Sequence, residues 1–241
     1  LAMEVQQSLL PKENPRIPGL DIAGISVYCD ETGGDYYDFI SVEAEGHPVT
    51  GVAVGDVSGH GISSALLMAT VRASLRQRAS IPGSTAQVIT DVNTLLAQDV
   101  EYSGDFMTLF FLLINTRQGS LEWVRAGHDP AVRYDPATDS FDELKGAGLA
   151  LGVQAEWQYE SQKLDDLSAG QIILLGTDGI WEAENSEGER IGKEPIYQVL
   201  REKAGANAPE ILQAVFDVLK KYVQGAKSDD DITAVVVKIE S

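Results

Sequence analysis

The sequence is poor in cysteine, in histidine and in positive charge, and each shortage excludes a class of protein. Cys29 is the only cysteine, so no disulfide can form within the chain, and a reducing, cytoplasmic location is expected. The three histidines do not form the cluster that a zinc site of histidine and cysteine ligands needs. The 37 acidic residues outnumber the 18 basic ones and give a net charge of −19, which argues against binding to nucleic acid or anionic membranes.

Long apolar runs and familiar catalytic loops are also missing. No apolar stretch is long enough to cross a bilayer, so we expect no membrane insertion by this segment, and no secretion signal is visible at Leu1. There is no Gly-X-Ser-X-Gly elbow with partner residues, and the acidic surroundings of Cys29 disfavour a reactive thiol. The glycine-rich segment 55–61 lacks the Lys-Ser/Thr end of a Walker loop. Any chemistry therefore needs an attacking water activated by a metal ion.

The hydrophobic and turn pattern predicts one packed domain after a short leading segment. Residues 1–10 predict the end of a helix stopped by Pro11, and 11–18 is punctuated by prolines, so we expect a linker over 1–19 and a single domain over 20–241. The helix expected at 62–78 places Ile62, Leu66, Ala69 and Ala73 on one face, and Ser84 is expected to cap the next helix. The expected strands are 22–29, 36–42, 49–57, 106–114, 121–125, 131–134, 157–164, 171–175 and 232–239. The expected helices are 62–78, 84–100, 195–203 and 209–223.

Strands that follow one another in runs, without regular helices between them, favour antiparallel sheets and an α+β fold. Two sheets packed face to face, with helix pairs outside, would bury both faces of the apolar strands. Periodicity alone does not prove that arrangement.

Four short acidic motifs lie beside apolar runs. They are Gly33-Gly34-Asp35, Gly55-Asp56-Val57-Ser58-Gly59-His60-Gly61, Thr177-Asp178-Gly179 and Asp229-Asp230-Asp231-Ile232-Thr233. A carboxylate at the end of a buried strand is costly to desolvate unless a cation neutralises it, and no Lys or Arg lies within the motifs. A shared divalent metal centre accounts for the pattern, and its all-oxygen ligands suit Mg2+ or Mn2+.

Each motif also has a simpler interpretation. Asp56 could bridge two cations, with the Val57 carbonyl as a further ligand, or Asp56 or Ser58 could simply cap the following helix. Asp35 could be a tight-turn residue, and Asp178-Gly179 is a common turn dipeptide. Asp230 could belong to a solvated acidic turn.

The histidines leave similar alternatives. His47 is expected in a surface turn. His128 could be a structural hydrogen-bonding residue or could lie near the substrate. His60 could protonate a leaving group, or it could pack at the start of the helix.

Taken in order, the motifs resemble the PPM family, the metal-dependent protein serine/threonine phosphatases of type 2C, and within it the bacterial SpoIIE/RsbU group. The resemblance covers about residues 20–239, and even Gln6 to Pro11 is similar to the helix that often precedes this domain. The remaining matched segments are Met107-Thr108-Leu109-Phe110, Ala126-Gly127-His128 and Gly148-Leu149-Ala150-Leu151-Gly152-Val153.

The resemblance implies a four-layer αββα sandwich with two Mn2+ or Mg2+ ions in a cleft at one edge. It implies that Asp56 bridges the ions, that the Val57 carbonyl binds one of them, and that Asp178 and Asp230 bind the other. It assigns Asp35 to holding water beside the metals, with Asp231 in support. Ser58 stands where eukaryotic members carry a catalytic histidine, so His60 matches no family position for a general acid.

The resemblance also implies hydrolysis of phosphoserine or phosphothreonine on a small regulatory protein of the anti-sigma antagonist type, in bacterial signalling. The leading helix suggests an attached sensor domain or activator, or a homodimer formed through that helix. Two other functions stay open: a catalytically inactive member that only binds partners, and a hydrolase of small phosphate esters.

Overall fold

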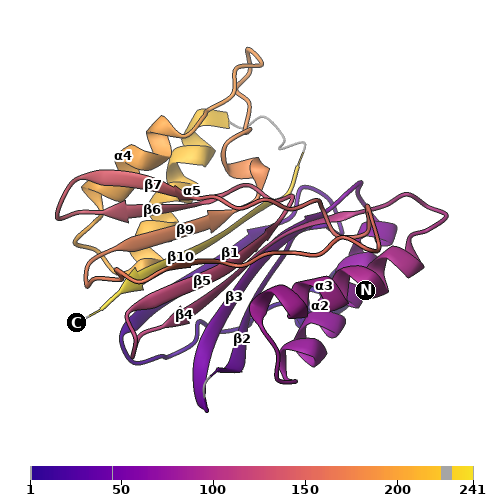
Figure 1. Ribbon diagram of the computed structural model, residues 1–241. Helices are drawn as coiled ribbons and strands as arrows, with labels where there is room; N and C mark the ends of the chain where they lie inside the picture. Colours follow the sequence, from indigo (N-terminus) through magenta and orange to yellow (C-terminus); the bar gives the residue numbers. More distant parts are fainter. Residues whose placement is uncertain (1, 45, 224–229, 241) are drawn as a thin grey trace.

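Two antiparallel sheets pack face to face, and each carries helices on its outer face (Figure 1). The computed structural model describes residues 2–44, 46–223 and 230–240. Helices α4 and α5 cover one sheet, and α2 and α3 cover the other, which confirms the four-layer αββα sandwich. The helices are α1 (Ala2–Leu9), α2 (Ile62–Ala79), α3 (Thr85–Asp99), α4 (Glu194–Glu202) and α5 (Ala208–Val223), with a short 3-10 helix η1 (Asp178–Ile180).

Each sheet has five strands, and every pairing is antiparallel. The first has the order β1–β10–β9–β6–β7, with β1 (Leu20–Val27), β10 (Ile232–Ile239), β9 (Ile172–Gly176), β6 (Ala131–Asp135) and β7 (Ser140–Leu144). The second has the order β2–β3–β4–β5–β8, with β2 (Tyr36–Ala44), β3 (His47–Val57), β4 (Met107–Asn115), β5 (Ser120–Ala126) and β8 (Gln162–Leu164).

The interior strand β10 shows why the sandwich needs two apolar faces on each sheet. Val235 and Val237 belong to the core between the sheets, whereas Ala234 and Val236 belong to the core beneath α4 and α5. All four side chains are fully buried. Burying a side chain such as valine stabilises the fold by roughly 1.5–3 kcal/mol, so a strand covered on both sides has to be apolar at almost every position.

Helix α2 packs through a different face from the one expected. Met68, Val71 and Leu75 are buried against the second sheet, whereas Ile62 and Leu66 are 64% and 66% exposed. Apolar and small residues of α2 are spread over several sides of the helix. A 3.6-residue period in the sequence is therefore compatible with more than one buried face.

Two strand predictions also differ from the structure. The strand expected at 157–164 is reduced to β8, because the backbone before it bonds to side chains of α3: the Tyr159 N–H donates to Thr90 Oγ1 at 3.2 Å, and Asn93 donates to the Gln154 carbonyl at 2.8 Å. The sequence pattern does not predict strand β7, because its residues, Ser-Phe-Asp-Glu-Leu, are mostly polar and the strand lies at a sheet edge.

The leading helix α1 contacts α2 and inserts one polar side chain into the domain. Gln6 is 4% exposed; its amide donates to the Gly33 carbonyl at 2.5 Å and accepts from the Gly33 N–H at 3.2 Å. No described helix is long and apolar enough to span a membrane. A separate linker unit over 1–19 stays a prediction.

Candidate active site

The predicted aspartates lie at strand ends that meet at one edge of the sandwich. Asp35 directly precedes β2 and Asp56 is the penultimate residue of β3, and these strands pair with Tyr36 opposite Gly55. Asp178 follows β9 by two residues and Asp231 directly precedes β10, and those strands pair with Gly176 opposite Ala234. Because β3 contacts both β9 and β10 across the sandwich, the two sheets each bring carboxylates to the same place.

Burial and, after it, mutual repulsion raise the pKa values of these carboxyl groups. Burial, followed by the negative charges of Asp178, Asp230 and Asp231, raises the pKa of Asp56 to about 7. Burial and then the charge of Asp56 hold the pKa of Asp35 well above its usual range. The charged forms of Asp56 and Asp35 are therefore disfavoured while no cation is bound.

The two acids from the first sheet are affected in the same direction. Burial and then the charge of Asp230 raise the pKa of Asp178. Partial burial of its carboxyl group raises the pKa of Asp230, although that residue is exposed as a whole, and the charges of Asp231 and Glu182 add to the effect. Asp229 lies outside the described residues.

Asp35 is tied to the opposite sheet through Thr177. The Thr177 hydroxyl donates to Asp35 Oδ2 at 2.9 Å and accepts from the Thr233 N–H at 3.1 Å. Asp35 is 1% exposed, so this contact fixes the orientation of a carboxylate that solvent does not reach. The placement fits a residue that orients groups at the site.

Asp231 orders the loop before β2. Its Oδ1 accepts from the Cys29 N–H at 2.8 Å, and its Oδ2 accepts from the Gly34 N–H at 3.0 Å. A side chain at position 34 would place its Cβ 2.7 Å from the Val57 carbonyl oxygen and 3.1 Å from Asp56 Oδ1. Glycine is therefore required at position 34 because the loop passes directly against the Asp56-Val57 backbone.

The donor set suits hard divalent cations. Asp35, Asp56 and Asp178 form no ion pair with any described Lys or Arg, so a cation from solution is needed to offset the repulsion. Over residues 2–44, 46–223 and 230–240, however, no three His, Cys, Asp or Glu side chains are already grouped to hold a metal ion. The carboxylates fit a metal in chemistry and charge, and their side chains would have to draw closer to bind one.

The histidines differ in their surroundings. His60 is exposed in the 58–61 loop before α2, and its role in protonating a leaving group stays a prediction. His47 is exposed at the start of β3, as expected. His128 is 3% exposed, and burial lowers its pKa to about 4, so the ring is neutral near pH 7.

Cys29 lies beside the site without becoming reactive. Burial, followed by a hydrogen bond to Asp231 and the charge of that carboxylate, raises the pKa of the Cys29 thiol to about 11. The thiol is therefore protonated at neutral pH, as its acidic surroundings in the sequence suggested.

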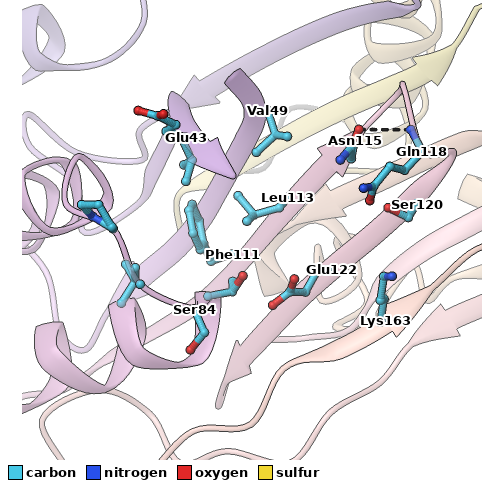
Figure 2. A pocket seen from close by; sticks show the side chains of 15 residues that line it. Glu43, Val49, Ser84, Phe111, Leu113, Asn115, Gln118, Ser120, Glu122 and Lys163 are labelled. Carbon is cyan, nitrogen blue, oxygen red and sulfur yellow. Dashed lines mark hydrogen bonds between the residues drawn. The ribbon is translucent and has the colours of Figure 1, made fainter. Parts of the chain in front are cut away.

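A groove of about 450 Å3 lies elsewhere, on the outer face of the second sheet beside the start of α3 (Figure 2). Glu43, Phe111, Glu122 and Lys163 are among its lining residues, and none of the five aspartates is. It also includes Val49, which precedes Asp56 by seven residues along β3, or about 23 Å in an extended strand. The groove is therefore separate from the carboxylate cluster.

The αββα sandwich and the carboxylate cluster agree with the protein family that the sequence motifs resemble. A family model described as Stage II sporulation protein E (SpoIIE) matches residues 47–240, and the chain belongs to this family. It is similar to the phosphoserine phosphatase RsbU of Bacillus subtilis (strain 168), with 29% identity over 99% of this chain and 69% of that protein. It is also similar to the phosphoserine phosphatase RsbP of the same organism, with 22% identity over 87% of this chain and 50% of that protein.

Solved structures show the same fold. The SiaA-PP2C domain of Pseudomonas aeruginosa matches with a TM-score of 0.84 and 23% identity, over 99% of this chain and 94% of that one. A crystal structure of RsbX in complex with magnesium matches with a TM-score of 0.69 and 15% identity, over 94% of this chain and 98% of that one.

Proposed function

We propose that this chain is a metal-dependent protein phosphatase domain that hydrolyses phosphoserine or phosphothreonine on a regulatory protein. The observation that supports it best is the meeting of aspartates from β2, β3, β9 and β10 at one edge, with raised pKa values and, for Asp35, Asp56 and Asp178, no described cationic partner. The names of RsbU and RsbP support the phosphatase activity, and the magnesium in the RsbX structure supports the use of a divalent cation.

Specific residues receive specific roles in this proposal. Asp56 and the Val57 carbonyl, from one sheet, and Asp178 and Asp230, from the other, would hold two Mn2+ or Mg2+ ions. When bound, these ions would neutralise the carboxylates, activate a water molecule and stabilise charge on the phosphoryl oxygens.

The supporting residues position the ligands. Asp35, held by Thr177, would orient water at the site, and Asp231 would keep the Cys29–Gly34 loop against the Asp56-Val57 backbone. The Cys29 thiol beside the site is protonated at neutral pH, and a direct attack by water is the proposed route.

The substrate and partners follow from the same family. A phosphorylated regulatory protein is the proposed substrate, with an upstream sensor domain or activator attached through the region of α1. The free Cys29 is compatible with the cytoplasmic location we propose.

A direct assay separates this function from its alternatives. We expect a serine phosphopeptide to be hydrolysed with Mn2+ present and not with EDTA, and we expect much weaker hydrolysis of p-nitrophenyl phosphate. Asp56→Ala and Asp178→Ala should abolish turnover while the fold is kept, and Glu160→Gln, on an exposed position, should leave it unchanged.

The possible results discriminate clearly. Hydrolysis that persists after complete metal removal would refute the mechanism. Mn2+ binding without any turnover would indicate the inactive, partner-binding alternative. Faster turnover of the small ester than of the phosphopeptide would indicate a small-ester hydrolase.

A further inference from the structure

One buried side chain crosses between the two sheets beside the carboxylate cluster. His128 lies in the connection from β5, in the second sheet, to β6, in the first. Its Nδ1 lies 2.8 Å from Thr108 Oγ1, and its Nε2 lies 3.1 Å from the Gly176 carbonyl oxygen. Thr108 belongs to β4 and Gly176 ends β9, so the ring joins one strand of each sheet.

The partners determine where the proton sits. A carbonyl oxygen can only accept, so Nε2 carries the proton and donates to Gly176. Nδ1 is then an acceptor for the Thr108 hydroxyl. The neutral ring thus makes one hydrogen bond to a strand of each sheet, each through a different nitrogen atom.

Each end of this bridge leads directly to a predicted ligand. Thr108 is the partner of Asp56 in the β3–β4 pairing, and Thr108 Oγ1 lies 3.4 Å from the Asp56 backbone oxygen. Gly176 is followed by Thr177, which bonds to Asp35, and by Asp178. The bridge therefore connects the strand end that carries Asp56 to the strand end that carries Asp178.

The backbone around His128 keeps the ring in place. Gly127 has a φ of +69°, and a Cβ there would lie 2.7 Å from the Ala150 nitrogen. The Gly127 N–H donates to the Gly148 carbonyl at 3.1 Å, and Arg125 Nη1 donates to the His128 carbonyl at 2.6 Å. These contacts hold the main chain on both sides of the ring, so the imidazole acts as a rigid spacer.

We propose that His128 is a positioning residue that sets the separation between the Asp56 end of one sheet and the Asp178 end of the other. This inference rests on the proposed function, in which carboxylates from both sheets hold the same pair of divalent cations. A ring fixed at both nitrogens defines that separation before any cation binds, so the strand ends stay in place and only the carboxylate side chains have to draw closer. Loss of either hydrogen bond would let the two strand ends drift apart.

The test uses variants that keep one end of the bridge at a time. His128→Asn keeps a side-chain amide near the position of Nδ1 and loses the hydrogen bond to the Gly176 carbonyl. His128→Gln reaches toward the Gly176 carbonyl and loses the acceptor for the Thr108 hydroxyl. Thr108→Val removes the hydroxyl with little change in volume, and Thr108→Ser restores it. His47→Gln, at the opposite end of β3 from Asp56, is the matched control.

Three quantities should be measured for each folded variant: the MnCl2 dissociation constant by calorimetry, turnover of a serine phosphopeptide, and urea unfolding in EDTA. We expect His128→Asn, His128→Gln and Thr108→Val to weaken Mn2+ binding by about 10–100-fold, the usual effect of losing an outer hydrogen bond at a metal site. At subsaturating Mn2+, kcat should fall by a similar factor while KM for the phosphopeptide changes less than about twofold. Thr108→Ser and His47→Gln should match the wild type.

The outcomes separate this inference from the proposed function. If the wild type binds no Mn2+, the proposed function fails and this inference fails with it. If the wild type binds Mn2+ and the His128 and Thr108→Val variants bind it equally well, only the positioning role is refuted. Reduced unfolding stability with unchanged Mn2+ affinity would also refute it, because a merely structural bridge predicts that result. If the His128 variants do not fold, the comparison of Mn2+ affinity between Thr108→Val and Thr108→Ser tests the positioning role by itself.

Discussion

Replacing Asp56 by asparagine should stabilise the metal-free protein while it abolishes metal binding. The carboxyl group of Asp56 has its pKa raised from 3.8 to about 7 by burial and by the neighbouring acids. A raised carboxyl pKa stabilises the folded state fully below the unfolded pKa, and this contribution is lost as the pH rises through the folded pKa. Asparagine does not titrate, so the advantage of Asp56→Asn should grow between about pH 4 and pH 7 and then level off.

The size of the effect follows from the shift. Between pH 5 and a folded pKa of about 7, the wild type loses roughly 3 kcal/mol relative to the variant, at about 1.4 kcal/mol for each pH unit. For a protein of this size that difference corresponds to about 5–10 °C in Tm.

Unfolding in urea with EDTA present, at pH 5 and pH 8, measures this directly. Glu160→Gln serves as the control for removing one negative charge from an exposed position. Saturating Mn2+ should reverse the order, because it stabilises the wild type and not Asp56→Asn. If Asp56→Asn in EDTA is no more stable at pH 8 than the wild type, or if its advantage does not grow with pH, burial and the neighbouring acids do not raise the pKa of Asp56 as described.

Three further outcomes are expected. Mn2+ affinity should rise as the pH increases from 5.5 to 7.5, because the proton held by Asp56 must leave; calorimetry in two buffers of different ionisation enthalpy would show the proton release, and a pH-independent affinity would contradict it. Gly34→Ala should destabilise the fold by about 1–3 kcal/mol and weaken Mn2+ binding, because its Cβ would lie 2.7 Å from the Val57 carbonyl; wild-type affinity would show that the loop can shift freely. Asp38→Ala should cost about 3 kcal/mol in urea unfolding, since fully buried Asp38 accepts from Tyr36 and Arg76; a loss below 1 kcal/mol would show that the pair is not structural.

Local signals in the sequence were enough for much of the fold. Ser84 accepts from the Gln87 N–H at 3.2 Å and caps α3, as its position before an apolar-periodic segment predicts. The β4–β5 hairpin follows from two apolar runs around a short turn at 116–119. The resemblance to a known family supplied the way in which these elements combine into layers.

The acidic motifs could be found in the sequence, and their convergence could be expected, because all of them adjoin apolar strands. What the sequence could not show is which partners hold them. Asp35 bonds to Thr177, which lies 142 residues away, and Gln6, in helix α1, bonds to Gly33. The sequence leaves two roles open for His128 for the same reason, since neither Thr108 nor Gly176 is close to it in the chain.

The position of β10 determines when, during synthesis and folding, the carboxylate site can be completed. Strand β10 lies between β1 and β9, so Leu20 pairs with Ile239 and the first sheet stays split until residues 232–239 are in place. Contacts of such long sequence separation form slowly and late. A ribosome-bound chain that ends before residue 230 should therefore carry Asp56 but no complete site, and it should be cleaved readily in limited proteolysis. If that truncated chain resisted protease, the two halves would be able to fold independently.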